Sequence, residues 1–594
     1  MHSPRRRSLH LRPAVRGAAM LAAIALVASC AATIAGTAVA PTGSRPTGSG
    51  PATSMSDGGQ ITEPSALPGQ STATPGPSAP TGTASATGTA SATSTASATR
   101  TAPVPAGLEK FYQQKLAWGR CDGYATNTDD AATYSSAALQ CAYLIAPMVY
   151  GKPSGPTVEI GVLRKVATNS SARIGSLLVN PGGPGGSGMS FVGAVAVQGS
   201  FAHLNERFDI VGFDPRGIGS SKPLIKCQTD AELDATRAVQ NRSNTPQAVT
   251  LADARLKKYA DQCVAETSAA NVDGKTFLAN VGTRDVAKDL DVLRAVLGDS
   301  KLSYLGFSYG TRIGYVYAEQ FPTNVRALVL DGAVDPDEDP ATEEVGQNRG
   351  FQQAFVTFAG WCAQHGPCAL GNDPAKATAR FQGLSRPLVE QPLKLSDGRV
   401  LSYGDATLGV ATAMYRQDSW PVLATALDKL ANGNGGPLMA LADAYYERDA
   451  SGHYAGKPDS FNAIRCVDEP RMTDPADVIK LNAAAAAAAP FQDSGDPAAD
   501  VPDICAVWPV PPTLGPHRLQ VPGLPAVLVV STTGDPATPY VNGVDLAKQL
   551  GARLLTFEGT RHTAFLLGGS SCVDDAGNSY LIDLRLPADG ARCS

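Results

Sequence analysis

What this chain lacks narrows its function before any motif is considered. No two of its eleven cysteines are spaced C-x-x-C, which argues against a zinc site or a dithiol redox centre. It has no basic stripe, and 49 Lys and Arg against 54 Asp and Glu give a formal net charge of −5, so nucleic acid is a poor partner. We expect no metal ion and no cofactor. Histidine is also scarce, with seven in 594 residues, so each one is informative.

The first forty residues are expected to be an export signal. Three arginines at positions 5–7 precede an apolar run at residues 18–29, which is too short to span a bilayer as a helix. Two endings stay open. The sequence VASC places Cys30 in a bacterial lipobox, where it would carry lipid, and we favour this ending. Cleavage after Ala40 would instead release a soluble protein. Either ending places the chain outside the cytoplasm, secreted or lipid-anchored at the cell surface.

Residues 41–106 are dominated by Pro, Thr, Ser, Ala and Gly and contain no aromatic residue. Such a segment buries too little apolar surface to offset the entropy of ordering, so we expect a disordered linker.

The remaining cysteines indicate disulfides. Ten are left once Cys30 is set aside, and an even number in an exported chain predicts five bonds. The sequence leaves their pairing open, and pairing of neighbours is the simplest hypothesis. It would join Cys121–Cys141, Cys227–Cys263, Cys362–Cys368, Cys466–Cys505 and Cys572–Cys593.

Beyond the linker, predicted strands and helices alternate, which is typical of an α/β fold with a mostly parallel sheet and helices on both faces. The alternation stops near residue 336 and resumes near residue 525. We therefore expect a core at 107–335 and 511–594, interrupted by a helical lid insertion at 336–510. The predicted strands are residues 157–167, 175–180, 208–214, 302–307 and 325–331, two further strands are expected within 525–539 and 552–560, and the predicted core helices are 283–297 and 309–320.

A serine between glycines lies where one of these strands should meet a helix. The sequence GFSYG, residues 306–310, matches the G-x-S-x-G pattern of a nucleophile elbow, in which a tight turn exposes the serine hydroxyl. The pattern is short, so it needs support from the rest of the chain. We take Ser308 as the candidate nucleophile of an acyl transfer.

A serine nucleophile needs a base and an acid that orients the base. His562 follows a predicted strand, whereas the other histidines of the globular region lie in the insertion, in a connector or beside a strand start. Asp535 ends a strand and gives the chain order Ser308, Asp535, His562 of the alpha/beta hydrolases. Asp331 also ends a strand, but we interpret it as a loop residue that closes the sheet edge.

Backbone N–H groups should stabilise the oxyanion. The N–H of Tyr309 follows the nucleophile at a helix N-terminus. The glycine-rich stretch NPGGPGGSG, residues 180–188, should supply the second donor, and we choose Gly183 before Gly182. This stretch lacks the Lys-Ser/Thr of a phosphate-binding loop.

Four stretches together resemble one family. NPGGPGGSG, FDPRGIGSS, GFSYGTRIGYVYAEQFP and STTGDPATP are similar to the secreted alpha/beta-hydrolase peptidases of actinobacteria, the tripeptidyl aminopeptidase family, which is related to the proline iminopeptidases. The resemblance runs from about residue 108 to the end of the chain, whose last segment looks like that family's C-terminal domain. Asn180 stands where the iminopeptidases have histidine, which favours the tripeptidyl branch. The resemblance implies release of short peptides, commonly tripeptides, from peptides or proteins with free N-termini.

An exopeptidase of this kind must hold a substrate ammonium group, and a buried carboxylate near Ser308 would do so. The candidates are acids at the two ends of the insertion, and for any one of them a solvent-facing lid position is the alternative. Asp468 is our first choice, because Cys466 could fix its loop. The other candidates are Glu343, Glu344 and Glu469.

Two other functions remain as alternatives. An esterase or lipase would use the same triad, and a lid lined by large apolar side chains would favour it. A non-catalytic wall-associated binding protein would need a broken triad. The sequence does not predict the oligomeric state.

Overall fold

The computed structural model describes residues 104–239, 245–268, 272–497 and 501–594. The predicted export signal, Cys30, the cleavage after Ala40 and nearly all of the predicted linker lie outside these ranges. Within them, no helix is both long and apolar enough to cross a membrane.

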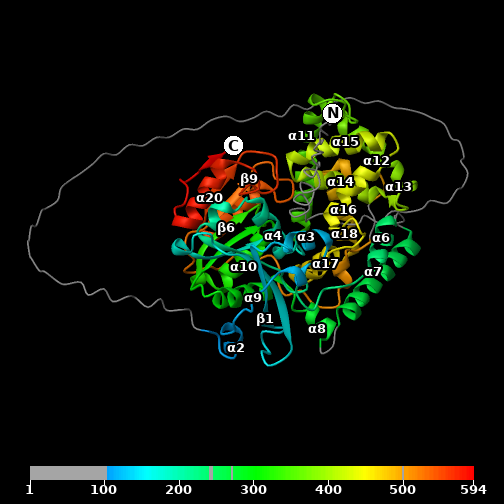
Figure 1. Ribbon diagram of the computed structural model, residues 1–594. Helices are drawn as coiled ribbons and strands as arrows, with labels where there is room; N and C mark the ends of the chain where they lie inside the picture. Colours follow the sequence, from blue (N-terminus) through cyan, green and yellow to red (C-terminus); the bar gives the residue numbers. More distant parts are fainter. Residues whose placement is uncertain (1–103, 240–244, 269–271, 498–500) are drawn as a thin grey trace, which may run out of the picture. The chain divides into compact units, whose positions relative to one another are not determined.

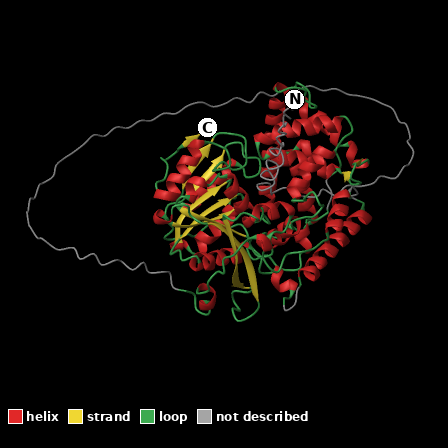
Figure 2. Ribbon diagram, in the orientation of Figure 1, coloured by secondary structure: helices red, strands yellow, loops and turns green. Residues whose placement is uncertain are grey.

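One mixed sheet forms the core, and nine strands in the described part of the chain belong to it (Figures 1 and 2). Their order is β1-β2-β4-β3-β5-β6-β9-β10-β11. All neighbours from β4 to β11 pair in parallel, whereas β1 and β2 pair antiparallel with each other and β2 pairs antiparallel with β4. The prediction of a mostly parallel sheet is therefore confirmed. The strands are β1 (Leu139–Pro147), β2 (Thr157–Lys165), β3 (Gly175–Asn180), β4 (Phe208–Phe213), β5 (Leu302–Phe307), β6 (Val325–Asp331), β9 (Leu528–Thr532), β10 (Arg553–Phe557) and β11 (Arg592–Cys593).

Helices cover both faces of the sheet. One apolar cluster joins the sheet to α9 (Thr283–Val296), α10 (Tyr309–Gln320) and α19 (Tyr540–Leu550). A second cluster joins the opposite face to α4 (Gly188–Gln198) and α20 (Ser571–Asp583). The central strands β3, β4 and β5 are buried at every position, which explains why they are apolar throughout rather than alternating.

A helical cap, which we define as residues 340–488, separates β6 from β9 (Figure 1). It has an apolar core of its own, built around Phe351, Phe355 and Trp420. One of its helices differs in placement, because α17 buries Ile464 and Val467 in the core domain instead. The cap elements are α11 (Pro340–Gln364), α12 (Ala377–Ser385), α13 (Pro387–Glu390), β7 (Leu393–Lys394), β8 (Val400–Leu401), α14 (Tyr403–Met414), α15 (Trp420–Ala431), α16 (Gly436–Tyr446), α17 (Lys457–Asp468) and α18 (Pro475–Ala488).

A second helical segment, which the sequence analysis had left inside the first part of the core, binds the cap. It consists of α6 (Asp230–Ala238), α7 (Pro246–Thr267) and α8 (Gly274–Leu278). Arg237 of α6 lies 3.0 Å from Asp405 and 2.7 Å from Asp443, both in the cap. The cap is therefore anchored to two separate stretches of the chain.

The described residues contain five disulfides, and these join neighbouring cysteines as the simplest hypothesis had them. The bonds are Cys121–Cys141, Cys227–Cys263, Cys362–Cys368, Cys466–Cys505 and Cys572–Cys593.

Candidate active site

Ser308 occupies the turn between β5 and α10, where the elbow was predicted. Its backbone has φ 55° and ψ −128°, a conformation that costs a residue with a side chain free energy. The flanking glycines are needed for packing. A Cβ on Gly306 would lie 2.4 Å from the carbonyl oxygen of Gly310, and one on Gly310 would lie 2.8 Å from that of Asn180. The G-x-S-x-G spacing therefore follows from the close approach of the helix start to two strands.

Asp535 and His562 form a buried pair. Nδ1 of His562 lies 2.9 Å from each carboxylate oxygen of Asp535, and both side chains are inaccessible to solvent. The N–H groups of Ala537 and Thr538 each donate to Asp535 Oδ1 at 2.9 Å and hold the carboxylate against the imidazole ring. Nδ1 is then the protonated nitrogen, and Nε2 of His562 is a buried acceptor with no hydrogen-bond partner among the described residues.

The imidazole lies next to the nucleophile turn. Phe307 and Asp331 pair directly across β5 and β6, so Ser308 and Gly332 leave the sheet side by side. A Cβ on Gly332 would lie 3.0 Å from Cε1 of His562. The structure thus brings Ser308, Asp535 and His562, which are 227 and 27 residues apart in sequence, to one edge of the sheet.

Asp331 has a different position. Its Oδ2 accepts the backbone N–H groups of Ala564 and Phe565, each at 2.8 Å, and it does not bond the imidazole. Burial raises the pKa of Asp331 to about 6, although these two N–H groups lower it. Asp331 therefore anchors the loop that carries His562, in agreement with the structural role expected for it.

The glycine loop packs on the nucleophile turn. Gly182 has φ 99°, and a Cβ there would lie 2.8 Å from Cβ of Ser308 and 3.1 Å from the backbone nitrogen of Tyr309. Only glycine allows this approach. The N–H of Gly182 is donated to Oδ1 of Asn180 at 2.9 Å, so it is not directed at an oxyanion. Gly183, the next residue, stays our candidate for the second donor.

Asp468 is buried, as a carboxylate that binds an ammonium group was expected to be, but its oxygens already have partners. Its side chain is only 2% exposed, and both oxygens are engaged by Thr283, one with the backbone N–H at 2.8 Å and the other with the hydroxyl. The hydroxyl of Thr283 lies 2.5 Å from that of Tyr309. Burial raises the pKa of Asp468 to about 6. This placement argues against Asp468 as an ammonium ligand and makes it a link between α17 and the residue after the nucleophile.

Glu343 and Glu469 meet at a residue that the sequence analysis missed. Arg312, one turn of α10 beyond Ser308, lies 3.6 Å from Glu343 and 3.4 Å from Glu469. Both carboxylates keep some exposure, 21% and 16% of the side chain. Burial, with repulsion from Glu469, raises the pKa of Glu343 to about 7 despite the attraction of Arg312. Three segments distant in sequence make this cluster, so only a predicted tertiary contact could have identified Arg312.

Further charges surround this cluster. Arg465 lies 3.6 Å from Glu469 and 2.5 Å from Asp503, and Glu344 also acts on Arg465, raising its pKa. Two arginines thus face five carboxylates, counting Asp468, so the cluster can accept an added positive charge.

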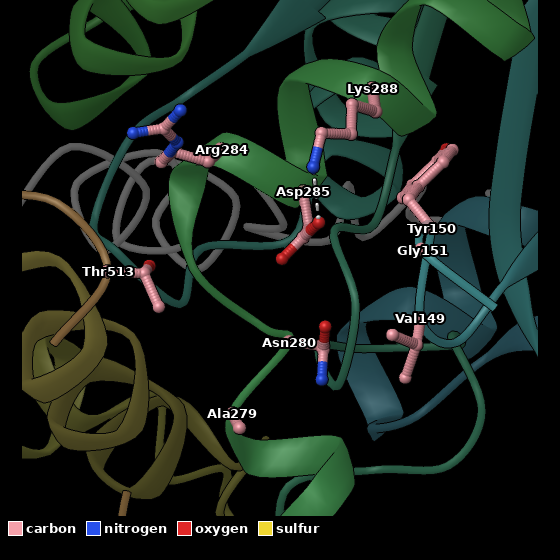
Figure 3. Close-up of a pocket in the computed structure, with 9 residues that line it drawn as sticks. All are labelled: Val149, Tyr150, Gly151, Ala279, Asn280, Arg284, Asp285, Lys288 and Thr513. Atoms are coloured by element: carbon pink, nitrogen blue, oxygen red, sulfur yellow. Dashed lines mark hydrogen bonds and ion pairs between the residues drawn. The ribbon is translucent and has the colours of Figure 1, made fainter. Parts of the chain in front are cut away.

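Figure 3 shows a separate hollow of about 230 Å³ around the start of α9. Arg284, one of the residues that line it, directly follows Thr283, which contacts Asp468. Its charged side chains are Arg284, Asp285 and Lys288, and the last two form an ion pair at 3.0 Å. None of the predicted site residues lines it.

Comparison with known proteins gives a consistent assignment. Residues 175–569 match the model of the alpha/beta hydrolase fold. The chain is 46% identical to the serine protease Hip1 of Mycobacterium tuberculosis over 76% of its own length and 87% of the relative's. It is 43% identical to carboxylesterase B of the same organism over 80% and 90% of the two chains. It is 30% identical to the tripeptidyl aminopeptidase of Streptomyces lividans over 77% and 84%. These matches confirm the resemblance noted from the sequence.

Proposed function

Because this chain belongs to the alpha/beta-hydrolase family, in the group that includes the tripeptidyl aminopeptidases, we propose that it is a serine peptidase with Ser308, His562 and Asp535 as its triad. The observation that carries this proposal is the buried Asp535–His562 pair, whose Nε2 is a base without a partner among the described residues, beside the Ser308 turn.

The mechanism follows from these positions. Ser308 Oγ attacks the scissile carbonyl carbon while Nε2 of His562 takes its proton. The imidazolium then gives this proton to the leaving amine as the C–N bond breaks, and a water molecule hydrolyses the acyl-enzyme by the reverse proton transfers. Asp535 holds the tautomer and stabilises the imidazolium. The N–H groups of Tyr309 and Gly183 stabilise the oxyanion.

We infer that the enzyme selects substrates with a free N-terminus. Glu343 and Glu469 are partly exposed near the start of α10 and both lie beside Arg312, while Glu469 also lies 3.6 Å from Arg465. An α-ammonium group would add a positive charge to a cluster in which carboxylates outnumber guanidinium groups, and it would donate charge-assisted hydrogen bonds to both carboxylates. Release of three residues at a time is the expectation taken from the Streptomyces relative.

An esterase is the second candidate, because a 43% identical relative is called a carboxylesterase. The triad would serve both reactions equally. The acids around Arg312 favour the peptidase, since an ester substrate gives them no charge to bind.

We further propose export, with Cys30 as a lipid anchor or cleavage after Ala40. The even set of ten cysteines in five disulfides supports an oxidising compartment.

A matched panel of chromogenic substrates tests the proposed function. The panel carries one, two or three residues on the reporter, each with a free and an acetylated N-terminus, together with a short-chain ester. Cleavage of the free tripeptide alone supports a tripeptidyl aminopeptidase. Cleavage of the ester with every peptide intact would move the protein to the esterase class.

A further inference from the structure

The cap touches the loop that carries the proposed catalytic acid. Gln347 of α11 donates from Nε2 to the carbonyl oxygen of Ala537 at 2.8 Å, and both residues are buried. One turn further along, the backbone of Gly350 is pressed against the same loop. A Cβ there would lie 2.5 Å from the carbonyl oxygen of Pro536 and 3.2 Å from that of Asp535. Ala537 itself belongs to the apolar core of the cap.

The cap also touches the proposed base. The backbone N–H of His562 donates to the carbonyl oxygen of Tyr415, the residue after α14, at 2.9 Å. The Tyr415 ring stands edge-on to the imidazole, with centroids 5.4 Å apart and planes at 79°. Phe351 also packs against this tyrosine, with 5.3 Å between ring centroids, and connects it to α11.

We propose that Gln347, Gly350 and Tyr415 are positioning residues for the Asp535–His562 pair, so that this side of the cap is a fixed wall of the active site rather than a lid that lifts. The inference rests on the proposed triad. Asp331 fixes the His562 loop from the core, and these three residues fix both loops from the cap. Lifting the cap here would break a backbone hydrogen bond of His562 itself.

The physical consequence concerns the orientation of the imidazole. The proton transfer requires Nε2 to lie within hydrogen-bond reach of Ser308, and a displacement of about 1 Å can cost a factor of about 100 in rate. The Tyr415 ring limits the rotation of the imidazole, and Gln347 limits movement of the 535–538 turn. Both residues are buried and contact the loops of Asp535 and His562, so their loss should affect turnover more than affinity.

The first experiment compares Tyr415→Leu, Tyr415→Phe and Phe355→Leu in the full chain. Phe355 is equally buried in the cap core but stacks on Phe491, away from both loops, and so controls for loss of cap stability. With an activated ester as substrate, Tyr415→Leu should lower kcat about tenfold or more while KM changes less than about twofold. Tyr415→Phe keeps the ring and should restore kcat, and Phe355→Leu should keep it.

A second pair of variants tests the inference even if the Tyr415 variants fail to fold. Gln347→Ala removes the bond to Ala537, whereas Gln352→Ala removes bonds on the same helix to Thr378 and to the backbone N–H of Phe491, which packs in the cap's apolar core. Gln347→Ala alone should lower kcat. Equal kcat in Tyr415→Leu and Phe355→Leu and in Gln347→Ala and Gln352→Ala would overturn the inference. A change in KM alone would do so as well. Absence of ester turnover and of fluorophosphonate labelling in the wild type would instead overturn the proposed function.

Discussion

Asp331 binds the backbone that follows His562 and leaves the imidazole to Asp535. Asp331 ends β6, whereas Asp535 lies in the loop that follows the neighbouring strand β9, and both are buried. They differ in what they hold, since Asp331 accepts two N–H groups of the loop and Asp535 accepts Nδ1–H of the ring. The two acids therefore make separable contributions to the site.

Replacing each acid with its amide should separate these contributions. Asp535→Asn removes the acceptor that sets the histidine tautomer and should lower kcat by about 10⁴-fold, as in other triads. Asp331→Asn keeps an oxygen for the two N–H groups and should stay within about tenfold of the wild type. Turnover of an activated ester measures both. A larger loss in Asp331→Asn would mean that Asp331 is the catalytic acid.

The raised pKa of Asp331 predicts how stability depends on pH. Its pKa of about 6 lies above the ordinary value, so the folded state binds this proton more tightly than the unfolded state. The associated stability is present below about pH 4 and is lost as pH rises through 6. Asp331→Asn lacks this loss. Its free energy of unfolding should therefore rise relative to that of the wild type between pH 4 and 7, by up to about 3 kcal/mol, and the difference in melting temperature should increase with it. The same dependence of melting temperature on pH in both proteins would contradict a buried Asp331 carboxyl with a raised pKa.

The backbone conformation of Ser308 predicts that two inactive variants differ in stability. Ser308→Ala and Ser308→Gly should both abolish turnover and fluorophosphonate labelling. Ser308→Gly should be the more stable, by about 1 kcal/mol or more, because glycine tolerates φ 55° and ψ −128° without strain. Calorimetry of the two proteins measures the difference. Labelling retained in either variant would show that Ser308 is not the nucleophile.

Sequence reasoning predicted the site best where chemistry and local geometry coincide. GFSYG gave both the end of β5 and the start of α10, because glycines flanking a serine are required by the turn itself. β3 and β6 were likewise predicted to the residue, since buried parallel strands are continuous apolar runs.

The parts that were missed depend on tertiary contacts. Asp468 looked like a lid acid, and its contact with Thr283 joins residues 185 positions apart. The pairing of Arg312 with Glu343 and Glu469 has the same origin. The antiparallel strand β1 was overlooked as well, and its position at the sheet edge rests on pairing with β2, 18 or more residues of sequence away at the strand ends furthest from the turn.

The pKa of Glu343 predicts a pH effect on binding that is specific to free N-termini. Glu343 must be ionised to bind an ammonium group, so KM for a free peptide should rise as pH falls below about 7. It should also rise above about pH 8, where the α-amino group loses its proton. KM for a short-chain ester should stay flat across both limits. A free peptide and the ester with the same KM profile would contradict the role of Glu343.

The most direct test of the account is the ratio of kcat/KM for a free tripeptide to that for its acetylated form. We predict a high ratio in the wild type and in Glu319→Gln, a control on α10 whose carboxylate binds His517 rather than Arg312. Glu343→Gln and Glu469→Gln should each lower the ratio by about tenfold or more, the value of one charge-assisted hydrogen bond, with ester turnover unchanged. A ratio near one in the wild type, or one that neither variant changes, would contradict the account.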